Sequence, residues 1–164
     1  MPRVFVSIGS NIDREKNVRT AVHALATDYH PLKLSSVYES TPFGFHGENF
    51  YNLVAGFDTD QGVEQVAARL AGIEQACGRV RDGKHHDSRT LDMDLLLYGN
   101  LKRHDQQIDV PRSEIAHHAF VLSPLAEIAP ELIHPESGLS IKEMWRRFAD
   151  RSQKLWPVAF DFQL

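Results

Sequence analysis

Two aspartates, Asp92 and Asp94, lie within an apolar segment and are well suited to bind metal ions. The segment runs from Leu91 through three consecutive leucines to Gly99, a length and boundary typical of a buried strand. Side chains two positions apart on a strand share a face and project in parallel, roughly 7 Å apart. Mg²⁺ takes oxygen ligands, commonly one or two protein carboxylates beside waters and phosphates. The pair therefore fits one or two divalent cations; the alternative is two aspartates facing solvent on a half-exposed strand.

Three arginines precede the aspartates within a short span. Arg79 and Arg81 follow Gly78, and Arg89 stands after a polar segment at residues 82–88. A guanidinium presents a planar fork of donors that matches phosphate oxygens. Cations followed by a metal-binding carboxylate pair predict a polyphosphate site.

The bulk properties indicate an ordinary globular protein. With 164 residues, 42% hydrophobic and 24% charged, we expect one domain spanning residues 1–164. The net charge of -4 argues against nucleic acid as the main partner. The single cysteine, Cys77, allows no internal disulfide and fits a reducing compartment, and we expect it to be a small buried residue of a helix. Neither a secretory signal nor a membrane span is recognisable, so we expect a cytoplasmic protein.

Hydrophobic periodicity predicts alternating strands and helices up to the aspartate strand. The expected order is a strand at residues 4–8, a helix capped by Asp13, strands at 32–38 and 50–57, a helix at 63–77 closed by Gly78, and the aspartate strand. This β-α-β-β-α-β order predicts an α+β, ferredoxin-like core, an antiparallel sheet with both helices on one face. The other face would be left free for ligands.

The segment between the second and third strands is rich in aromatic residues. Residues 39–49 contain Pro42, Phe43 and Phe45, and Phe50 follows directly. Either these rings anchor the loop, or one or two of them stack on a flat ligand. Asn52, inside the third strand, needs partners if buried, because its amide both donates and accepts.

Helices are expected after the sheet core. Residues 102–104 suggest a surface hairpin or connection, and a short apolar helix is bounded by Pro124 and Pro130. Another helix is capped by Ser140, with Glu143 three residues on. We expect four further apolar side chains to pack this C-terminal part against the sheet: Trp145, Phe148, Leu155 and Trp156.

Several short motifs, in this order, resemble the 6-hydroxymethyl-7,8-dihydropterin pyrophosphokinase family. The resemblance covers residues 4–135, and its most specific piece is the R-T-L-D-x-D block at residues 89–94. The other pieces are residues 7–11, 40–42, Asn52, 73–74, 78–81, 120–122, 124–125 and 128–130. It implies transfer of a pyrophosphoryl group from ATP to the pterin hydroxymethyl group, with release of AMP, in folate biosynthesis. ATP and the pterin would be the partners, and we expect a monomer.

The resemblance also implies residue roles. Asp92 and Asp94 would hold two Mg²⁺ ions, and the catalytic set would be these aspartates with Arg79, Arg81 and Arg89. The implied pterin-binding residues are Thr41, Pro42, Phe43, Phe50, Asn52 and Phe120. The implied ATP-binding residues are Arg81, Arg89, Arg112, Ser113 and His118. Glu74 matches an acidic position near the site, where it would either touch the ligand or orient an arginine.

Three residues, in two places, depart from the family pattern. Arg112 and Ser113 stand in place of a His-Pro pair, and His118 stands in place of an arginine. Arg112 can still donate to a phosphate, whereas a histidine is largely neutral near pH 7. The departures leave open a diverged paralogue that binds pterin or nucleotide with little turnover. A ferredoxin-like domain with a sensing or interaction role is a third reading, which gives no reason for paired aspartates beside arginines.

Overall fold

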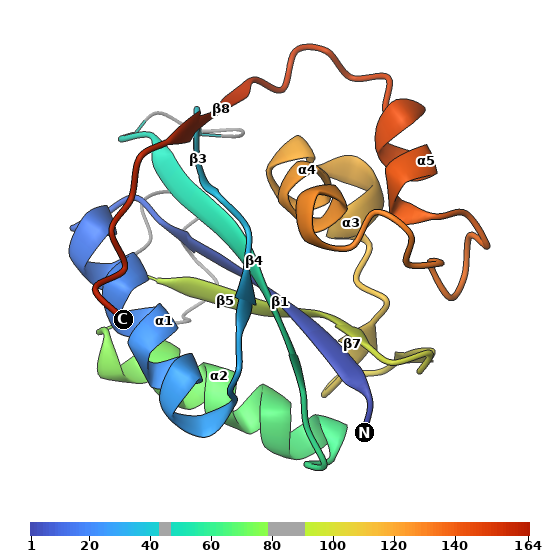
Figure 1. Cartoon of the computed structure of the whole chain (residues 1–164), viewed down its shortest axis with the longest axis horizontal. Helices are drawn as coiled ribbons and strands as arrows, with labels where there is room; N and C mark the ends of the chain where they lie inside the picture. Colours follow the sequence, from blue (N-terminus) through green and yellow to red (C-terminus); the bar gives the residue numbers. More distant parts are fainter. Residues whose placement is uncertain (43–46, 79–90) are drawn as a thin grey trace.

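The computed structural model describes residues 1–42, 47–78 and 91–164. Its centre is a six-stranded sheet in which every strand pair is antiparallel. The strands are β1 (Arg3–Ser10), β2 (Lys33–Leu34), β3 (Val37–Ser40), β4 (Phe50–Asp58), β5 (Asp92–Tyr98) and β8 (Leu155–Val158). Their order is β5-β1-β4-β3-β8, with β2 also paired to β4 (Figure 1). The aspartate strand, β5, therefore lies beside the first strand, as a ferredoxin-like arrangement requires.

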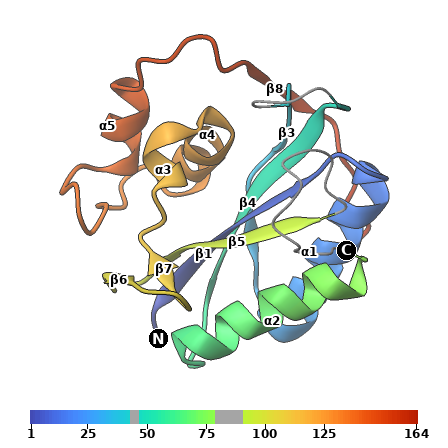
Figure 2. The same ribbon diagram turned by 180° about the vertical axis from the view of Figure 1, so that it is seen from behind.

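Two long helices cover one face of the sheet, as predicted. They are α1 (Arg14–Asp28) and α2 (Val63–Ala76). In each, apolar residues recur at helical spacing and are buried: Val18, Ala21, Val22 and Leu25 in α1, and Val63, Val66, Leu70 and Ile73 in α2. They pack on strand residues such as Val6, Ile8 and Leu53 to form the larger core. Figure 2 shows both helices on the same side of the sheet.

The opposite face is not left free, which corrects the sequence expectation. Three short helices lie over part of it: α3 (Glu114–His117), α4 (Ala119–Ile128) and α5 (Ile141–Arg146) (Figure 1). The physical reason is that this face also carries apolar side chains. Phe5, Val54, Leu96 and Leu97 are buried there in a second core. Burying them removes apolar area from water, which stabilises the fold by about 25 cal/mol for each Å² buried.

Helix α4 begins earlier than expected. It includes Pro124 rather than starting there. Proline lacks an N–H and cannot donate to the carbonyl of Phe120, four residues earlier. The buried side chains Val121, Leu122 and Leu125 hold this helix against the sheet despite that loss.

Chain ends and caps give further differences. The expected strand at 32–38 is split into β2 and β3, and β8 was not predicted. Trp156 lies on β8 at the sheet edge and is 40% exposed, so it does not pack as expected.

Asp13 occupies the N-cap position of α1 with φ of 43° and makes no capping hydrogen bond. Ser140 does cap α5, because its Oγ accepts from the Glu143 N–H at 3.1 Å.

A small hairpin follows the core, as expected. It pairs β6 (Arg103–His104) with β7 (Asp109–Val110). Cys77 directly follows α2 and is partly buried; burial raises the pKa of its thiol. Within the described residues, every helix is too short or too polar to cross a membrane.

Candidate active site

The aspartates and Asn52 lie on one face of the sheet. Strand register places Asp92 opposite Gly9 of β1, and Gly9 opposite Asn52 of β4. Residues paired in this way point to the same face, and neighbouring strands lie about 4.8 Å apart. Asp92 and Asn52 are therefore separated by two strand spacings, about 10 Å. Asp94 lies opposite Ser7 and shares this face, which is also the face that α4 partly covers.

Gly9 makes room at the centre of this row. A Cβ atom at Gly9 would lie 2.9 Å from Oδ1 of Asn52 and 3.9 Å from a ring carbon of Phe50. The first distance is shorter than a Cβ atom tolerates without a shift of its neighbour. A side chain here would displace the Asn52 amide, so the missing side chain allows Asn52 to lie over the strand.

Asn52 is buried and held by a neighbouring strand. Its Nδ2 donates to Oγ of Ser40 at 2.7 Å. Phe50 pairs with Ser40 across the same two strands and points to the same face as Asn52. Two of the predicted pterin residues thus lie next to each other on β4.

Asp92 and Asp94 are partly exposed, while Met93 between them is buried in the α1/α2 core. The strand therefore presents its two carboxylates on the face that α1 and α2 leave uncovered. Among the residues that the structure describes, no three His, Cys, Asp or Glu side chains converge as a metal site. In the described part of the chain, this carboxylate pair is the group that could hold an ion here, together with ligand or water oxygens.

Glu74 fixes the backbone between the aspartates. Its side chain on α2 is buried, and Oε2 accepts a hydrogen bond from the Met93 N–H at 2.8 Å. The sequence left open whether Glu74 touches a ligand or orients an arginine. The structure adds the Met93 contact, through which α2 positions the strand that carries both carboxylates. The three predicted arginines lie outside the described residues, so both alternatives stay predictions.

Arg112 reaches the aspartates from the other side. Its Nη2 lies 3.5 Å from Oδ1 of Asp94, and its Nε lies 2.5 Å from Oε2 of Glu114. Its backbone N–H donates to the carbonyl of Leu96 on β5 at 3.0 Å. Burial lowers the pKa of Arg112, but the carboxylates of Asp94, Glu114 and others outweigh it, and the pKa is raised overall. The guanidinium is thus held charged beside the proposed metal ligands.

His118 and Phe120 form a stacked pair at the start of α4. Their ring centroids are 4.9 Å apart, with 22° between the planes. Burial is the main cause that lowers the pKa of His118. A neutral imidazole supplies no positive charge, so His118 does not replace the family arginine electrostatically. Ser113 precedes α3 and makes no side-chain cap there.

Part of the predicted pterin set lines a pocket of about 150 Å³. Thr41 and Pro42 come from the segment after β3, and Phe120 from α4. The remaining lining residues are Ser40, Ala119, Ser152, Gln153, Lys154 and Leu155. Sequence reasoning missed residues 152–155, because no motif marks them and they lie more than 100 positions from Thr41.

Some predicted residues cannot be placed. Phe43 and the three arginines Arg79, Arg81 and Arg89 lie outside the described residues. Their assignments stay predictions.

Comparison with known proteins agrees with the resemblance seen in the sequence. The model of the 7,8-dihydro-6-hydroxymethylpterin-pyrophosphokinase (HPPK) family matches residues 5–130. A 2-amino-4-hydroxy-6-hydroxymethyldihydropteridine pyrophosphokinase of Haemophilus influenzae is 32% identical over 154 residues, covering 92% of this chain and 95% of the relative. One from Pseudomonas aeruginosa is 36% identical over 143 residues, covering 82% and 85%.

Other relatives are longer proteins. The folic acid synthesis protein fol1 of Pneumocystis carinii is also 32% identical, but the chain spans only 21% of it. A Plasmodium falciparum HPPK-DHPS structure with pteroate superimposes with a TM-score of 0.69 at 13% identity. That match covers 92% of this chain and 44% of the other, and it shows a shared fold.

Proposed function

The chain belongs to the 7,8-dihydro-6-hydroxymethylpterin-pyrophosphokinase family, and from this we propose that it transfers the pyrophosphoryl group of ATP to 6-hydroxymethyl-7,8-dihydropterin. The acceptor is the pterin hydroxymethyl group, and AMP is released. The names of the relatives in Haemophilus influenzae and Pseudomonas aeruginosa support this proposal. We assign the activity to a single domain, residues 1–164, that acts as a monomer in the cytoplasm.

The row Asp92–Gly9–Asn52 carries the proposal. It places the proposed metal ligands and the proposed pterin reader on one face, about 10 Å apart. A transfer between ATP and a pterin needs the phosphates and the acceptor hydroxyl within one site. The register of β5, β1 and β4 supports such a site.

We assign Asp92 and Asp94 as ligands of two Mg²⁺ ions. Hard oxygen donors on one face fit this ion, and their partial exposure leaves room for water and phosphate oxygens. When bound, the ions supply positive charge next to the ATP phosphates, where charge develops during transfer. Glu74 keeps the two carboxylates in place through the Met93 N–H.

Arg112 is proposed to donate to an ATP phosphate. It is already charged, partly buried and 3.5 Å from Asp94, so it lies where phosphates bound to the Asp94 metal would arrive. Arg79, Arg81 and Arg89 are proposed to contribute further phosphate contacts. Ser113 and His118 complete the proposed nucleotide set, with His118 as an uncharged member.

The pterin is proposed to stack between Phe50 and Phe120, with Asn52 reading its edge. Asn52 has a fixed amide, because Ser40 accepts from its Nδ2. Thr41, Pro42 and Phe43 would supply the remaining wall, with backbone groups near the ring. The 150 Å³ pocket is lined by Thr41, Pro42 and Phe120 but not by Phe50 or Asn52, so it supports the Phe120 side of this location.

The first experiment measures AMP release from ATP and 6-hydroxymethyl-7,8-dihydropterin with Mg²⁺. We expect pterin-dependent AMP from the unaltered protein and loss of at least about a hundredfold in kcat for Asp94→Ala. Because Asp94 is partly exposed, we expect the variant to fold, and circular dichroism checks this. A folded protein that binds pterin but forms no AMP would support the diverged binder and overturn the proposal.

A further inference from the structure

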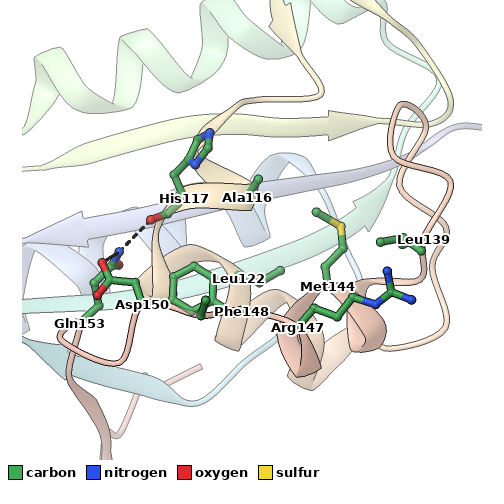
Figure 3. A pocket seen from close by; sticks show the side chains of 10 residues that line it. Ala116, His117, Leu122, Leu139, Met144, Arg147, Phe148, Asp150 and Gln153 are labelled. Carbon is green, nitrogen blue, oxygen red and sulfur yellow. Dashed lines mark hydrogen bonds between the residues drawn. The ribbon is translucent and has the colours of Figure 1, made fainter.

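Gln153 connects the C-terminal part of the chain to the start of α4. Its Oε1 accepts a hydrogen bond from the Ala119 N–H at 2.8 Å. Its Nε2 donates to the carbonyl of His117 at 2.9 Å, a contact drawn in Figure 3. Gln153 lies 34 and 36 positions along the chain from these two residues and outside the family match at residues 5–130.

The two bonded groups are helix ends that need partners. Ala119 is the first residue of α4, and the first N–H groups of a helix have no partner within that helix. His117 is the last residue of α3, where carbonyls lack helical partners. One amide side chain therefore joins the end of α3 to the start of α4, across His118.

The direction of the Gln153 amide is fixed by its surroundings. Its Nε2 also donates to Oδ2 of Asp150 at 2.9 Å. Asp150 is itself held by Ser152, whose backbone N–H and Oγ both donate to Oδ1. Two acceptors on one side and one donor on the other leave the amide a single favourable orientation.

Gln153 also lies between two pockets. It lines the 150 Å³ pocket that contains Phe120, Thr41 and Pro42. It equally lines a second pocket of about 420 Å³ between α4 and α5, where Leu122, Met144 and Phe148 supply apolar walls (Figure 3). A change in the position of Gln153 would therefore alter the wall of the proposed pterin site next to Phe120.

We propose that Gln153 is a positioning residue for pterin binding. It holds the turn from His117 to Ala119, and thereby sets the position of the His118–Phe120 stack against Thr41 and Pro42. This inference rests on the proposed function, because it assigns Phe120 to the pterin. It adds a determinant of pterin affinity that lies beyond the matched part of the chain.

Two variants separate the polar contacts of Gln153 from its bulk. Gln153→Met keeps the length of the side chain but removes all three hydrogen bonds. Gln153→Glu can still accept from the Ala119 N–H, but it cannot donate to His117 and places a second carboxylate beside Asp150. Arg151→Ala is the matched control, because Arg151 is an exposed neighbour that lines neither pocket.

The test measures the Kd of 6-hydroxymethyl-7,8-dihydropterin by calorimetry, with Mg²⁺ and a non-hydrolysable ATP analogue, together with kcat and both KM values. For Gln153→Met we expect the pterin Kd and KM to rise about tenfold, with kcat and the KM for ATP within about twofold. Gln153→Glu should also weaken pterin binding, and Arg151→Ala should match the unaltered protein.

The outcomes are distinct. Unchanged pterin Kd in a folded Gln153→Met would overturn the inference, as would an equal loss for both substrates. If one variant does not fold, the other gives the answer. Absence of AMP from the unaltered protein would count against the proposed function, whereas the calorimetric comparison tests Gln153 separately.

Discussion

The guanidinium of Arg112 lies 3.5 Å from the carboxylate of Asp94. This pair joins one of the two sequence departures to a proposed metal ligand. Arg112 is also tied to Glu114 and, through its backbone, to Leu96 of β5. Because an opposite charge at this distance stabilises both ions, Arg112 offsets the negative charge that two neighbouring aspartates create. The arginine is therefore part of the aspartate site.

Arg112→Ala should weaken ATP binding selectively. Loss of a charged phosphate contact costs about 1.5–3 kcal/mol, so the KM for ATP should rise roughly tenfold to a hundredfold. The pterin Kd should change little, because Arg112 does not line the pocket of Phe120. Steady-state kinetics and calorimetry measure the two quantities.

Arg146→Ala serves as the control for Arg112, since Arg146 forms an exposed ion pair with Glu143 on the distant helix α5. It should leave both substrates unaffected. An unchanged KM for ATP in Arg112→Ala would contradict the proposed phosphate contact and leave Arg112 only its ion pair with Asp94.

Gly9→Ala should weaken pterin binding. The added Cβ would lie 2.9 Å from Oδ1 of Asn52, so the Asn52 amide must move from its place beside Ser40. We expect the pterin Kd to rise at least about tenfold. The measurement is calorimetry with the pterin and Mg²⁺.

Gly62→Ala is matched to Gly9→Ala. The nearest atom to a Cβ at Gly62 is Oε1 of Gln65 at 3.8 Å, an ordinary contact. Its pterin Kd should stay within about twofold. Equal affinities for the two variants would show that Asn52 is not held by the space at Gly9.

Acid should destabilise the protein through His134. Burial is the main cause that lowers the pKa of His134 below its ordinary 6.5. Its Nδ1 accepts from the N–H groups of Glu136 and Ser137 at 3.2 and 3.0 Å, and a protonated Nδ1 cannot accept. Because the unfolded chain binds this proton more readily, the free energy of unfolding should fall as the pH drops below about 6.5 and onward through the lower, folded pKa.

His134→Asn tests this pH dependence, because an asparagine oxygen can accept the same two bonds without titrating. Urea unfolding between about pH 8 and pH 5 should show a smaller loss of stability for the variant than for the unaltered protein. The pKa of His118 is also lowered, so part of the pH dependence of the free energy of unfolding should remain in the variant. His104 acts in the opposite direction, since hydrogen bonds to Asp109 and Glu136 raise its pKa. Identical slopes in variant and parent would contradict the assignment to His134.

Local patterns in the sequence determined much of this protein. The spacing of apolar residues located α1 and α2, and the apolar run with Asp92 and Asp94 located β5. The motifs at residues 89–94 and beyond were sufficient to recognise the family, which the family match confirms. These features can be predicted from the sequence because the pattern of buried side chains in a strand or helix repeats every few residues.

The tertiary structure alone decided which distant groups meet. Glu74 bonds to the Met93 N–H, Arg112 lies at Asp94, and Gln153 lies at the start of α4. It also placed β8 at the sheet edge and α4 on the second face. No repeating pattern of nearby residues predicts these contacts, because each joins segments that are far apart in the sequence. They depend on the path of the whole chain and on which apolar face of the sheet still had to be covered.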